Sequence, residues 1–483
     1  MKYLKVIISS IIAGLLLPVY ALAAAETFEV SAWIPYWRTE KGVSSILPNI
    51  STFTEVNPFV YTVKTNGELH QATSIRSADW KALKAASEKE GVRFIPTVMW
   101  ASSDLIDETL RNPAKRQAHI RSIAREVFKY DFDGIDIDYE AKYAKTRPFF
   151  SLFLKELDEA IGYNKWIMCT IESRTPLEAR YSSPESIPDD IEYANDFTEI
   201  NKYCDRVRVM AYDQGRIDLQ LNKEREHPYI PVADVAWVEK AMRLAMEDID
   251  ADKLVLGVPT YGYEWDMFAY KDDQEDIRYS KLWSFNPGYA TELATKLGLT
   301  PTRNSSGELM LTFTASLSPE PSIPLPNATR ILTWSDAEAV KDKIELAQEL
   351  GIRGVAVFKI DGGEDPKVWD IVNEFEGSEI SKTAEKAPDI ELAQRIVDER
   401  INLPLPEIDL EYGDRREEVK MLQAFLNAAG FAVSPSGPGS LGNETTFFGP
   451  ATEAALIKFQ KAHAVWPSVG YFGPKTRSTM GAL

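Results

Sequence analysis

The stretch from Asp133 to Glu140 carries the side chains best suited to chemistry, and it reads Asp-Gly-Ile-Asp-Ile-Asp-Tyr-Glu. Successive side chains of a strand point to opposite faces, so Asp136, Asp138 and Glu140 would share one face. Carboxylates crowded on one face repel one another, which raises the pKa of at least one and holds a proton near neutral pH. A retained proton beside fixed carboxylates is what acid catalysis of a glycosidic bond requires.

Two other interpretations fit these acids taken alone. Alternating acidic and apolar residues could form the solvated face of an ordinary amphipathic strand, or a carboxylate cage for a hard cation such as Mg²⁺ or Ca²⁺. The four His residues are scattered, and neither HExxH nor CxxC spacing occurs, so the sequence carries no zinc signal. We expect no metal and no cofactor.

Short apolar runs alternate with amphipathic stretches from residue 28 to about residue 375. Eight strands that alternate with helices predict an α/β protein, a (β/α)₈ TIM barrel rather than an open sheet. The predicted strands are Phe28–Pro35, Pro58–Val63, Arg93–Met99, Gly134–Glu140, Trp166–Ile171, Arg206–Tyr212, Lys253–Thr260 and Gly354–Ile360. The predicted helices include Ala78–Glu90, Pro113–Lys129, Asp234–Asp248 and Asp336–Leu350.

In such barrels the active site lies at the carboxyl ends of the strands, and Glu140 ends the fourth predicted strand. This position argues against the solvated-strand interpretation. About 90 residues separate the seventh and eighth predicted strands, far more than one helix needs. We predict a small α+β insertion there, with strands in Tyr270–Ser284 and Leu309–Ser316, that could wall one side of a cleft.

The two ends of the chain differ from the barrel region. Residues 1–23 read as a signal peptide, because Lys2 and Lys5 precede an apolar stretch and Ala21-Leu22-Ala23 supplies small residues for cleavage. A membrane anchor is the alternative. Residues 377–407 are acidic and rich in Pro, as expected of a linker. Residues 408–483 predict a small bundle of three short helices, in which two similar Gly-Pro segments each begin a helix.

Net charge, the lengths of the apolar segments and the two cysteines indicate which partners and which location to expect. The net charge of −19 argues against nucleic acid as a partner, because phosphate binding needs clustered Lys and Arg. No later segment reaches membrane-spanning length, so we expect an exported, soluble monomer, secreted or associated with the cell wall. Cys169 and Cys204 are the only cysteines. Export would allow them to pair, whereas the apolar run around Cys169 favours a plain buried thiol.

Residues 27–376 resemble glycoside hydrolase family 18. The signature Asp-x-x-Asp-x-Asp-x-Glu of the fourth barrel strand is matched by Asp133, Asp136, Asp138 and Glu140. The sixth-strand signature is matched by Met210-Ala211-Tyr212-Asp213, and the seventh-strand pattern by Gly257–Gly262, which includes Tyr261. The form of this last motif, with Trp265 after it, is similar to the bacterial branch that acts on cell-wall polymers.

The resemblance implies a substrate-assisted, retaining hydrolysis in which the acetamido oxygen of the sugar replaces an enzyme nucleophile. Glu140 would protonate the leaving oxygen and then activate water. Asp138 would orient the acetamido group, and Asp136 beneath it would share a proton with Asp138. Tyr212 would hold the acetamido oxygen, and Asp213 would contact the distorted sugar. Asp133, with the opposite parity, would shape the start of the strand.

Aromatic side chains after the barrel strands are candidates for sugar stacking, with core packing as the alternative. The proposed substrate-binding set comprises Met210, Asp213, Trp33, Tyr36, Trp100, Tyr261, Trp265 and Phe358. The family usually carries Trp at the end of the eighth strand, where this chain has Phe358. Glu172 and Arg174, after the fifth strand, also depart from the expected small residues and are either substrate contacts or a salt-linked pair.

The C-terminal unit resembles the peptidoglycan-binding type 1 domain. The matching residues are Leu422-Gln423, Leu426-Asn427, Gly430-Phe431, Gly449-Pro450, Thr452, Phe459-Gln460, Gly473-Pro474 and Thr476-Arg477. Together the resemblances imply an exported enzyme that cuts β-1,4 bonds after N-acetylglucosamine in peptidoglycan. The alternatives are a chitinase or endo-N-acetylglucosaminidase acting on chitin or N-glycans, and a non-catalytic carbohydrate-binding protein.

Overall fold

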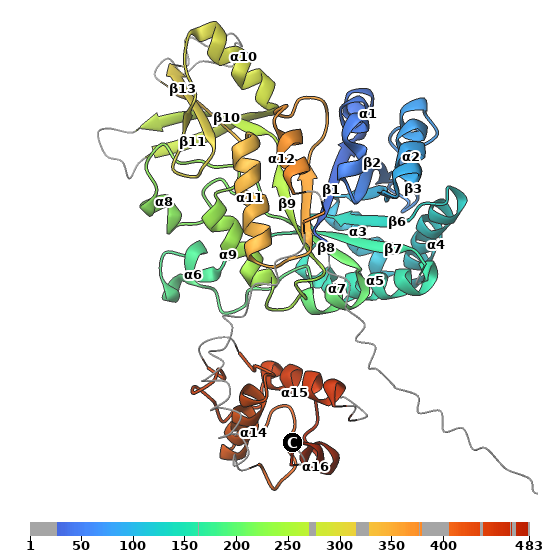
Figure 1. Ribbon diagram of the computed structural model, residues 1–483, viewed down its shortest axis with the longest axis vertical. Helices are drawn as coiled ribbons and strands as arrows, with labels where there is room; N and C mark the ends of the chain where they lie inside the picture. Colours follow the sequence, from blue (N-terminus) through green and yellow to red (C-terminus); the bar gives the residue numbers. More distant parts are fainter. Residues whose placement is uncertain are drawn as a thin grey trace, which may run out of the picture. The chain divides into compact units, whose positions relative to one another are not determined.

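The computed structural model describes residues 27–162, 164–269, 277–314, 328–375, 377–378, 405–434, 438–463, 465 and 470–481. The chain divides into two compact units, Met1–Lys382 and Thr383–Leu483, each with its own hydrophobic core (Figure 1). The predicted signal peptide, residues 1–23, and most of the predicted linker, residues 377–407, lie outside the described residues. Among the described residues, no helix is both long and apolar enough to cross a membrane.

A closed barrel of parallel strands forms the centre of the first unit, which confirms the predicted fold. The strands pair in the order β1-β15-β9-β8-β7-β6-β5-β2, and β2 pairs back to β1. Their bounds are β1 Glu29–Pro35, β2 Glu55–Val63, β5 Thr97–Trp100, β6 Gly134–Tyr139, β7 Trp166–Glu172, β8 Arg206–Met210, β9 Leu254–Pro259 and β15 Gly354–Phe358. Two short strands, β3 Leu69–Gln71 and β4 Arg93–Phe94, also pair with β2. The third predicted run is therefore divided between β4 and β5.

Helices connect the strands around the barrel. They are α1 Thr39–Ile46, α2 Ala78–Glu90, α3 Ser103–Arg111, α4 Pro113–Lys129, α5 Arg147–Ile161, α6 Leu177–Arg180, α7 Phe197–Tyr203, α8 Leu221–Glu224, α9 Val235–Ala245, α11 Ala337–Glu349 and α12 Val368–Glu374. The start of α4 shows how sequence sets such a boundary. The Asn112 side chain accepts hydrogen bonds from the backbone N–H groups of Ala114 and Lys115, and Pro113 occupies the first turn.

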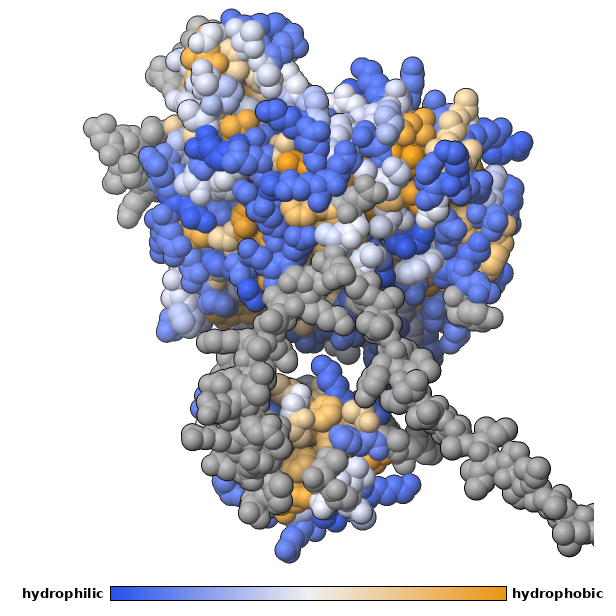
Figure 2. All heavy atoms as spheres, viewed as in Figure 1, coloured by the Kyte–Doolittle hydropathy of each residue, from blue (hydrophilic) through white to orange (hydrophobic). Residues whose placement is uncertain are grey.

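The two faces of β6 explain both the packing and the position of the acids. Ile135, Ile137 and Tyr139 are fully buried in the main core. The Tyr139 ring stacks on Phe153 of α5, with the two ring centroids 5.5 Å apart, so this face packs against the surrounding helices. The alternate residues, Asp136 and Asp138, then face the barrel interior. The surface of the unit is mostly hydrophilic in the view of Figure 2, as expected from the acidic composition.

A second sheet is inserted between β9 and β15. Its strands pair antiparallel in the order β11-β10-β14-β13-β12, and α10, Pro287–Leu297, packs with them. The strand bounds are β10 Gly262–Ala269, β11 Ile277–Phe285, β12 Thr302–Arg303, β13 Leu309–Thr314 and β14 Thr329–Trp334. The predicted strands overlap β11 and β13, whereas the sequence reasoning missed β10 and β14. Residues 270–276 of the first predicted strand lie outside the described residues.

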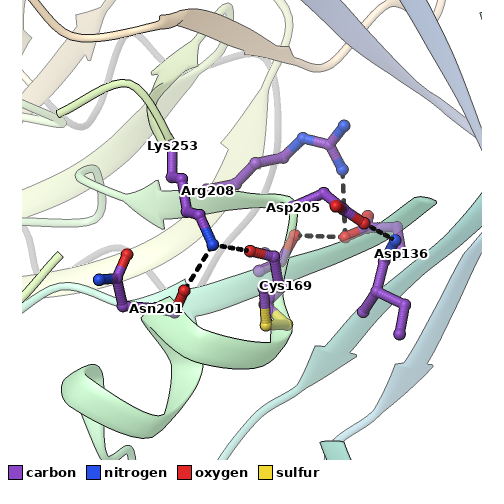
Figure 3. The surroundings of a disulfide bond; sticks show 9 residues. Asp136, Cys169, Asn201, Asp205, Arg208 and Lys253 are labelled. Atoms are coloured by element: carbon purple, nitrogen blue, oxygen red, sulfur yellow. Dashed lines mark hydrogen bonds and ion pairs between the residues drawn. A yellow bond between two sulfur atoms is a disulfide. The ribbon is translucent and has the colours of Figure 1, made fainter. Parts of the chain in front are cut away.

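Cys169 and Cys204 form a disulfide, so the expectation of a plain buried thiol at Cys169 is wrong (Figure 3). Cys169 lies within β7, and Cys204 follows the last residue of α7. Their Cα atoms are 5.9 Å apart, well within the range that a disulfide can bridge. The apolar run around Cys169 does not reveal its partner, because Cys204 comes close only when β8, two residues further on, pairs with β7.

The second unit contains α14 Glu417–Ala428, α15 Pro450–Ala462 and α16 Pro474–Met480. The two Gly-Pro segments do begin helices, at Pro450 and at Pro474. Each is fixed by a buried glutamine of the preceding helix. Gln423 donates to the carbonyl of Phe447 and to the Thr452 hydroxyl. Gln460 donates equivalently to the carbonyl of Tyr471 and to the Thr476 hydroxyl. The loose sequence repeat is thus a structural repeat.

Candidate active site

The three acids of the fourth-strand motif lie at the carboxyl end of the barrel. Asp136 and Asp138 are buried on the inner face of β6. Glu140 follows the last residue of the strand and is half-buried, with its backbone N–H still donating to the carbonyl of Trp100. Asp133 lies at the other end, where its side chain accepts a hydrogen bond from the backbone N–H of Phe94 at 2.7 Å. The alternation therefore places one carboxyl group at the opening of the barrel and two below it.

Asp136 is held by donors from four other strands. Its Oδ2 accepts from Trp33 Nε1 at 3.0 Å and from the Thr97 hydroxyl at 2.7 Å. Its Oδ1 accepts from the Thr170 hydroxyl at 2.8 Å and lies 3.1 Å from Nη1 of Arg208. A buried carboxylate with a guanidinium and three neutral donors is both neutralised and fixed in orientation.

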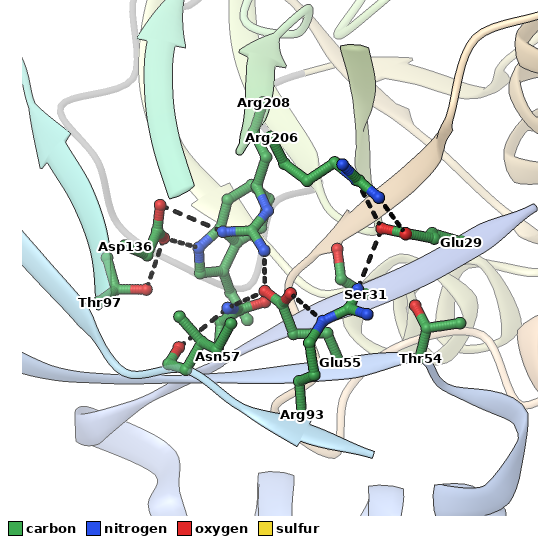
Figure 4. A network of polar contacts seen from close by, with 12 residues as sticks. Glu29, Ser31, Thr54, Glu55, Asn57, Arg93, Thr97, Asp136, Arg206 and Arg208 are labelled. Carbon is green, nitrogen blue, oxygen red and sulfur yellow. Dashed lines mark hydrogen bonds and ion pairs between the residues drawn. The ribbon is translucent and has the colours of Figure 1, made fainter. Parts of the chain in front are cut away.

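Arg208 extends this arrangement into a chain of buried and half-buried charges below the site (Figure 4). Its other terminal nitrogen pairs with Glu55, which also pairs with Arg93 Nε at 3.2 Å. Arg93 and Arg206 both pair with Glu29, at 3.0 and 2.6 Å. The positive charge that faces Asp136 is thereby compensated within the barrel, which allows Arg208 to be almost completely buried.

Asp138 and Glu140 have the raised proton affinity that the sequence predicts. Burial, followed by the charges of Glu140 and Asp136, raises the pKa of Asp138 well above its ordinary value. Burial and the charge of Glu172 raise the pKa of Glu140, while Lys142 acts in the opposite direction. Within the described chain, the buried Oδ1 of Asp138 has no hydrogen-bond partner. Asp138 therefore has an unused acceptor oxygen, and the neighbouring Glu140 is a carboxyl group that can carry a proton.

An aromatic group from three strand ends borders these carboxyl groups. The rings of Tyr212 and Phe358 are stacked, with centroids 5.6 Å apart and an interplanar angle of 14°. Tyr261 meets both rings edge-on, at 6.2 and 5.9 Å. Burial, followed by the charge of Asp138, raises the pKa of Tyr212, so its hydroxyl remains a neutral donor. Tyr212 and Phe358 are half-buried, which leaves part of each ring accessible.

Asp213 is exposed at the end of the sixth-strand motif and is oriented by two tyrosines. Its Oδ1 accepts from the hydroxyl of Tyr261 at 2.5 Å and from that of Tyr263 at 2.7 Å. The backbone of Asp213 has φ of 60°, in the left-handed region that non-glycine residues rarely occupy. Such strain is often kept at functional sites.

The structure corrects two of the predicted stacking residues. Trp33 is 2% exposed, and its indole N–H is directed at Asp136. Trp100 is 3% exposed and packs in the main core against Tyr139 and His119, at 5.4 and 5.3 Å between centroids. Neither ring offers a free face to a sugar. Trp33 supports the carboxyl group below the site, and Trp100 packs on the outer side of β6.

The other predicted contacts are distributed around the barrel opening. Tyr36 and Met210 are half-buried at the ends of β1 and β8. Trp265 is 9% exposed on β10 and packs with Ile230 and Ile331. Lys281 lies over the rings of both Tyr263 and Trp265, at 3.9 and 5.6 Å. Trp265 therefore belongs to the base of the insertion, two residues along β10 from a tyrosine that orients Asp213.

Two exposed tryptophans were missed by the sequence reasoning. Trp37 is 49% exposed and meets the rings of Tyr36 and Phe59 edge-on. Trp283, on β11, is 43% exposed, and its indole N–H donates to Glu264 at 2.7 Å. Trp37 could have been found because it comes directly after Tyr36. Trp283 gave no comparable signal, since its exposure depends on the insertion's own sheet.

Glu172 and Arg174 contact other groups rather than each other. Arg174 lies between the rings of Tyr193 and Phe197, 4.0 and 3.6 Å from their centroids. Glu172 Oε2 is 3.7 Å from the amine of Lys142. No group of three or more His, Cys, Asp or Glu among the described residues could hold a metal ion. Lys142 is a positively charged neighbour of the acid cluster.

The barrel and the acids at its opening define a class of protein: a (β/α)₈-barrel glycosidase with its proton-carrying carboxyl groups at the end of the fourth strand. Comparison with known families agrees. The chain belongs to the glycosyl hydrolases of family 18, whose family model matches residues 34–363. Residues 415–480 match a peptidoglycan binding domain.

Related proteins include both cortical fragment-lytic enzymes and chitinases. The uncharacterized glycosylase YvbX of Bacillus subtilis is 24% identical over 56% of this chain and 69% of its own length. The cortical fragment-lytic enzyme of Bacillus anthracis is 22% identical over 56% of each chain, so the match spans about half of that relative.

Two solved structures share the fold. The spore cortex-lytic enzyme SleL of Bacillus cereus is 18% identical, with a TM-score of 0.56 over 73% of this chain and 75% of that one. A chitinase of Chromobacterium violaceum is 16% identical, with a TM-score of 0.57 over 73% of this chain and all of that one.

Proposed function

We propose that this protein is an exported endo-β-N-acetylglucosaminidase that cleaves β-1,4 bonds after N-acetylglucosamine in peptidoglycan. One observation carries the proposal. Glu140 is half-buried at the barrel opening and has a raised pKa, directly above a buried Asp138 with an unused acceptor and a raised pKa of its own. A carboxylic acid at an opening can donate a proton to a leaving oxygen, and the group beneath it can hold a polar group of the same sugar.

The reaction would be substrate-assisted and retaining. Glu140 donates its proton to the glycosidic oxygen as the bond to the anomeric carbon breaks. The acetamido oxygen of the sugar forms a new bond to that carbon, which gives a cyclic oxazolinium ion. Glu140, now a carboxylate, removes a proton from water as the water opens this ring. Asp138 accepts the acetamido N–H and stabilises the positive charge, and Tyr212 donates to the acetamido oxygen.

The contacts of Asp136 refine the role that the family resemblance suggests for it. A guanidinium and three neutral donors surround its carboxylate. The buried Oδ1 of Asp138 has no hydrogen-bond partner among the described residues. We therefore assign the proton of this group to Asp138 and Glu140, whose pKa values are both raised, and give Asp136 the role of a fixed hydrogen-bond acceptor beneath them.

The C-terminal unit supports the choice of peptidoglycan. A binding domain for the polymer raises the effective concentration of the catalytic unit at its substrate. The N-terminal segment, with Lys2 and Lys5 before an apolar stretch, supports export and a secreted or wall-associated location, and we propose that the protein is a monomer. The mechanism requires no metal and no cofactor.

Product analysis tests the proposal. The protein from Ala24 onward and its Glu140→Gln variant are each incubated with purified peptidoglycan and with colloidal chitin. The soluble products are identified by mass spectrometry. We expect muropeptides with reducing N-acetylglucosamine ends, and a loss of at least about a hundredfold in rate for Glu140→Gln. The exposed substitution Glu88→Gln is the control and should leave the rate unchanged.

Each result decides between candidates. Chito-oligosaccharides alone would overturn peptidoglycan as the substrate and make the protein a chitinase. Products that persist at the full rate in a folded Glu140→Gln variant would overturn the assigned acid. If neither polymer is cut, a non-catalytic carbohydrate-binding function replaces the proposal.

A further inference from the structure

The backbone turn directly after Glu140 is held in an unusual conformation. Ala141 has φ of 54°, in the left-handed region that a residue with a Cβ atom avoids unless its surroundings impose it. Its N–H donates to Glu172 Oε1 at 2.9 Å, and its carbonyl accepts from the Ser103 hydroxyl at 2.5 Å. The segment that carries Glu140 is therefore clamped from both sides.

Lys142, the next residue, is a buried cation beside the acids. Its side chain is 0% exposed, and its amine lies 3.7 Å from Glu172 Oε2 and 4.6 Å from the centroid of the Phe150 ring. The amine also donates to the carbonyl of Tyr139. Burial lowers the pKa of Lys142, whereas Glu172, Asp138 and Glu140 favour its charged form.

Glu172 connects the clamp and the cation. Besides the contact with Ala141, its Oε2 accepts from Asn195 Nδ2 at 2.7 Å. Burial raises the pKa of Glu172, but Lys142 and these hydrogen bonds outweigh burial, and the pKa lies below its ordinary value. Glu172 is therefore an anion with a defined contact on each carboxylate oxygen.

The other charges around Glu140 are few and come from defined elements. Asp138 lies below it on β6, Glu172 comes from β7, and Asp213 from the end of β8. Tyr212 is the neighbouring neutral donor. Among the described groups, Lys142 is the cation that lowers the pKa of Glu140. Arg208 contacts Asp136 instead.

We propose that Lys142 and Glu172 are a pair of positioning residues for Glu140, which fix the turn behind its carboxyl group and place one cation and one anion beside it. The inference rests on the proposed role of Glu140 as the acid. The two residues would act on Glu140 through their charges as well as by fixing the backbone turn. Removing the cation must make Glu140 harder to deprotonate, and removing the anion must make it easier.

The pH dependence of hydrolysis reports how Lys142 and Glu172 together set the pKa of Glu140. Activity requires protonated Glu140, so the alkaline limb of the rate profile follows its deprotonation. Lys142→Met should move this limb to higher pH and Glu172→Gln to lower pH, each by on the order of one pH unit. The double variant Lys142→Met/Glu172→Gln should return the limb close to its wild-type position. A purely structural role would change rates without this pattern of opposite and cancelling shifts.

Lys343 offers a matched control. It is likewise completely buried, and carboxylates led by Glu308 favour its charged form, but it lies on α11, outside the site. Lys343→Met should leave the alkaline limb in place even if it lowers stability. This control separates the charge beside Glu140 from the general cost of losing a buried lysine.

A second measurement makes the test independent of hydrolysis. In full-length protein labelled with ¹³C at the glutamate side-chain carboxyls, the Glu140 resonance is assigned by its absence from Glu140→Gln and titrated by NMR. The same opposite shifts are expected in the Lys142→Met and Glu172→Gln variants without substrate. Shifts in the same direction, or none, would overturn the inference whatever the activity. Opposite shifts in a protein that cuts neither polymer would overturn the proposed function alone.

Discussion

Replacing Arg208 with Met tests whether the buried charges below the site hold the barrel together. The substitution leaves Glu55 and Asp136, 1% and 0% exposed, without the guanidinium between them (Figure 4). Breaking a buried ion pair by removing one partner typically costs about 3–5 kcal/mol, because a charge stays buried without compensation.

The remaining contacts place the expected loss at the low end of that range. Glu55 keeps Arg93 and the Asn57 amide, and Asp136 keeps its three neutral donors. We therefore expect the free energy of unfolding to fall by about 3 kcal/mol. With a urea m-value of about 3 kcal/mol/M, this corresponds to a midpoint about 1 M lower.

Tryptophan fluorescence during urea unfolding reports this change for the correct unit. Ten of the 11 tryptophans precede residue 376, and only Trp466 lies in the second unit. The surface pair of half-buried Lys84 and exposed Glu88 supplies the control, and Lys84→Met should cost less than about 1 kcal/mol.

A double-mutant cycle then separates charge from packing. Glu55→Gln in the Arg208→Met background removes one of the two carboxyl groups, Glu55 and Asp136, that have lost the guanidinium. The double variant should lose less stability than the sum of the single losses, by about 0.5–3 kcal/mol. The reasoning is refuted if Arg208→Met unfolds at the same urea concentration as the Lys84→Met control, or if the two losses simply add.

Two further predictions follow from the buried groups of the first unit. Since the pKa of Asp138 is raised in the folded protein, its ionisation opposes folding, a cost that is absent below its ordinary value of 3.8 and grows as pH rises towards the raised value. Asp138→Asn should therefore raise the denaturation midpoint at pH 7 but not at pH 3, while hydrolysis is lost; equal midpoints at pH 7 would contradict the raised pKa. The disulfide closes a loop with a sequence separation of 35, worth roughly 4 kcal/mol by loop entropy. Cys169→Ser/Cys204→Ser should lower the urea midpoint accordingly, and a reducing agent should then have no effect on the variant.

The candidate acids and the barrel strands could be predicted because local patterns encode them. The period-two alternation from Asp136 to Glu140 requires only that the segment be a strand. Because the segment is the fourth apolar run of a predicted barrel, Glu140 is expected at the carboxyl end of the fourth strand. The helices Ala78–Glu90 and Pro113–Lys129 agree with the sequence to the residue, because apolar spacing and terminal residues mark both ends.

The predictions that failed depended on partners distant in the sequence. Trp33 and Trp100 lie near the carboxyl ends of β1 and β5, where a stacking residue would be expected, yet the first donates to Asp136, 103 residues away, and the second packs on His119. The Cys169–Cys204 pairing depends on β8 lying beside β7. A side chain's exposure is a property of what packs on it, and no local pattern reports that.

The sequence by itself determined which carboxyl groups share one face of a strand, the barrel fold that presents them at one opening, and the presence of a second, helical unit. Only the tertiary structure decided their electrostatic setting. It brought Arg208 from β8 beneath Asp136 and Glu172 from β7 beside Lys142 and Glu140. Charge interactions act through space and are strong where water is excluded. The proton affinities of these acids therefore depend on distances that exist only once the barrel has closed.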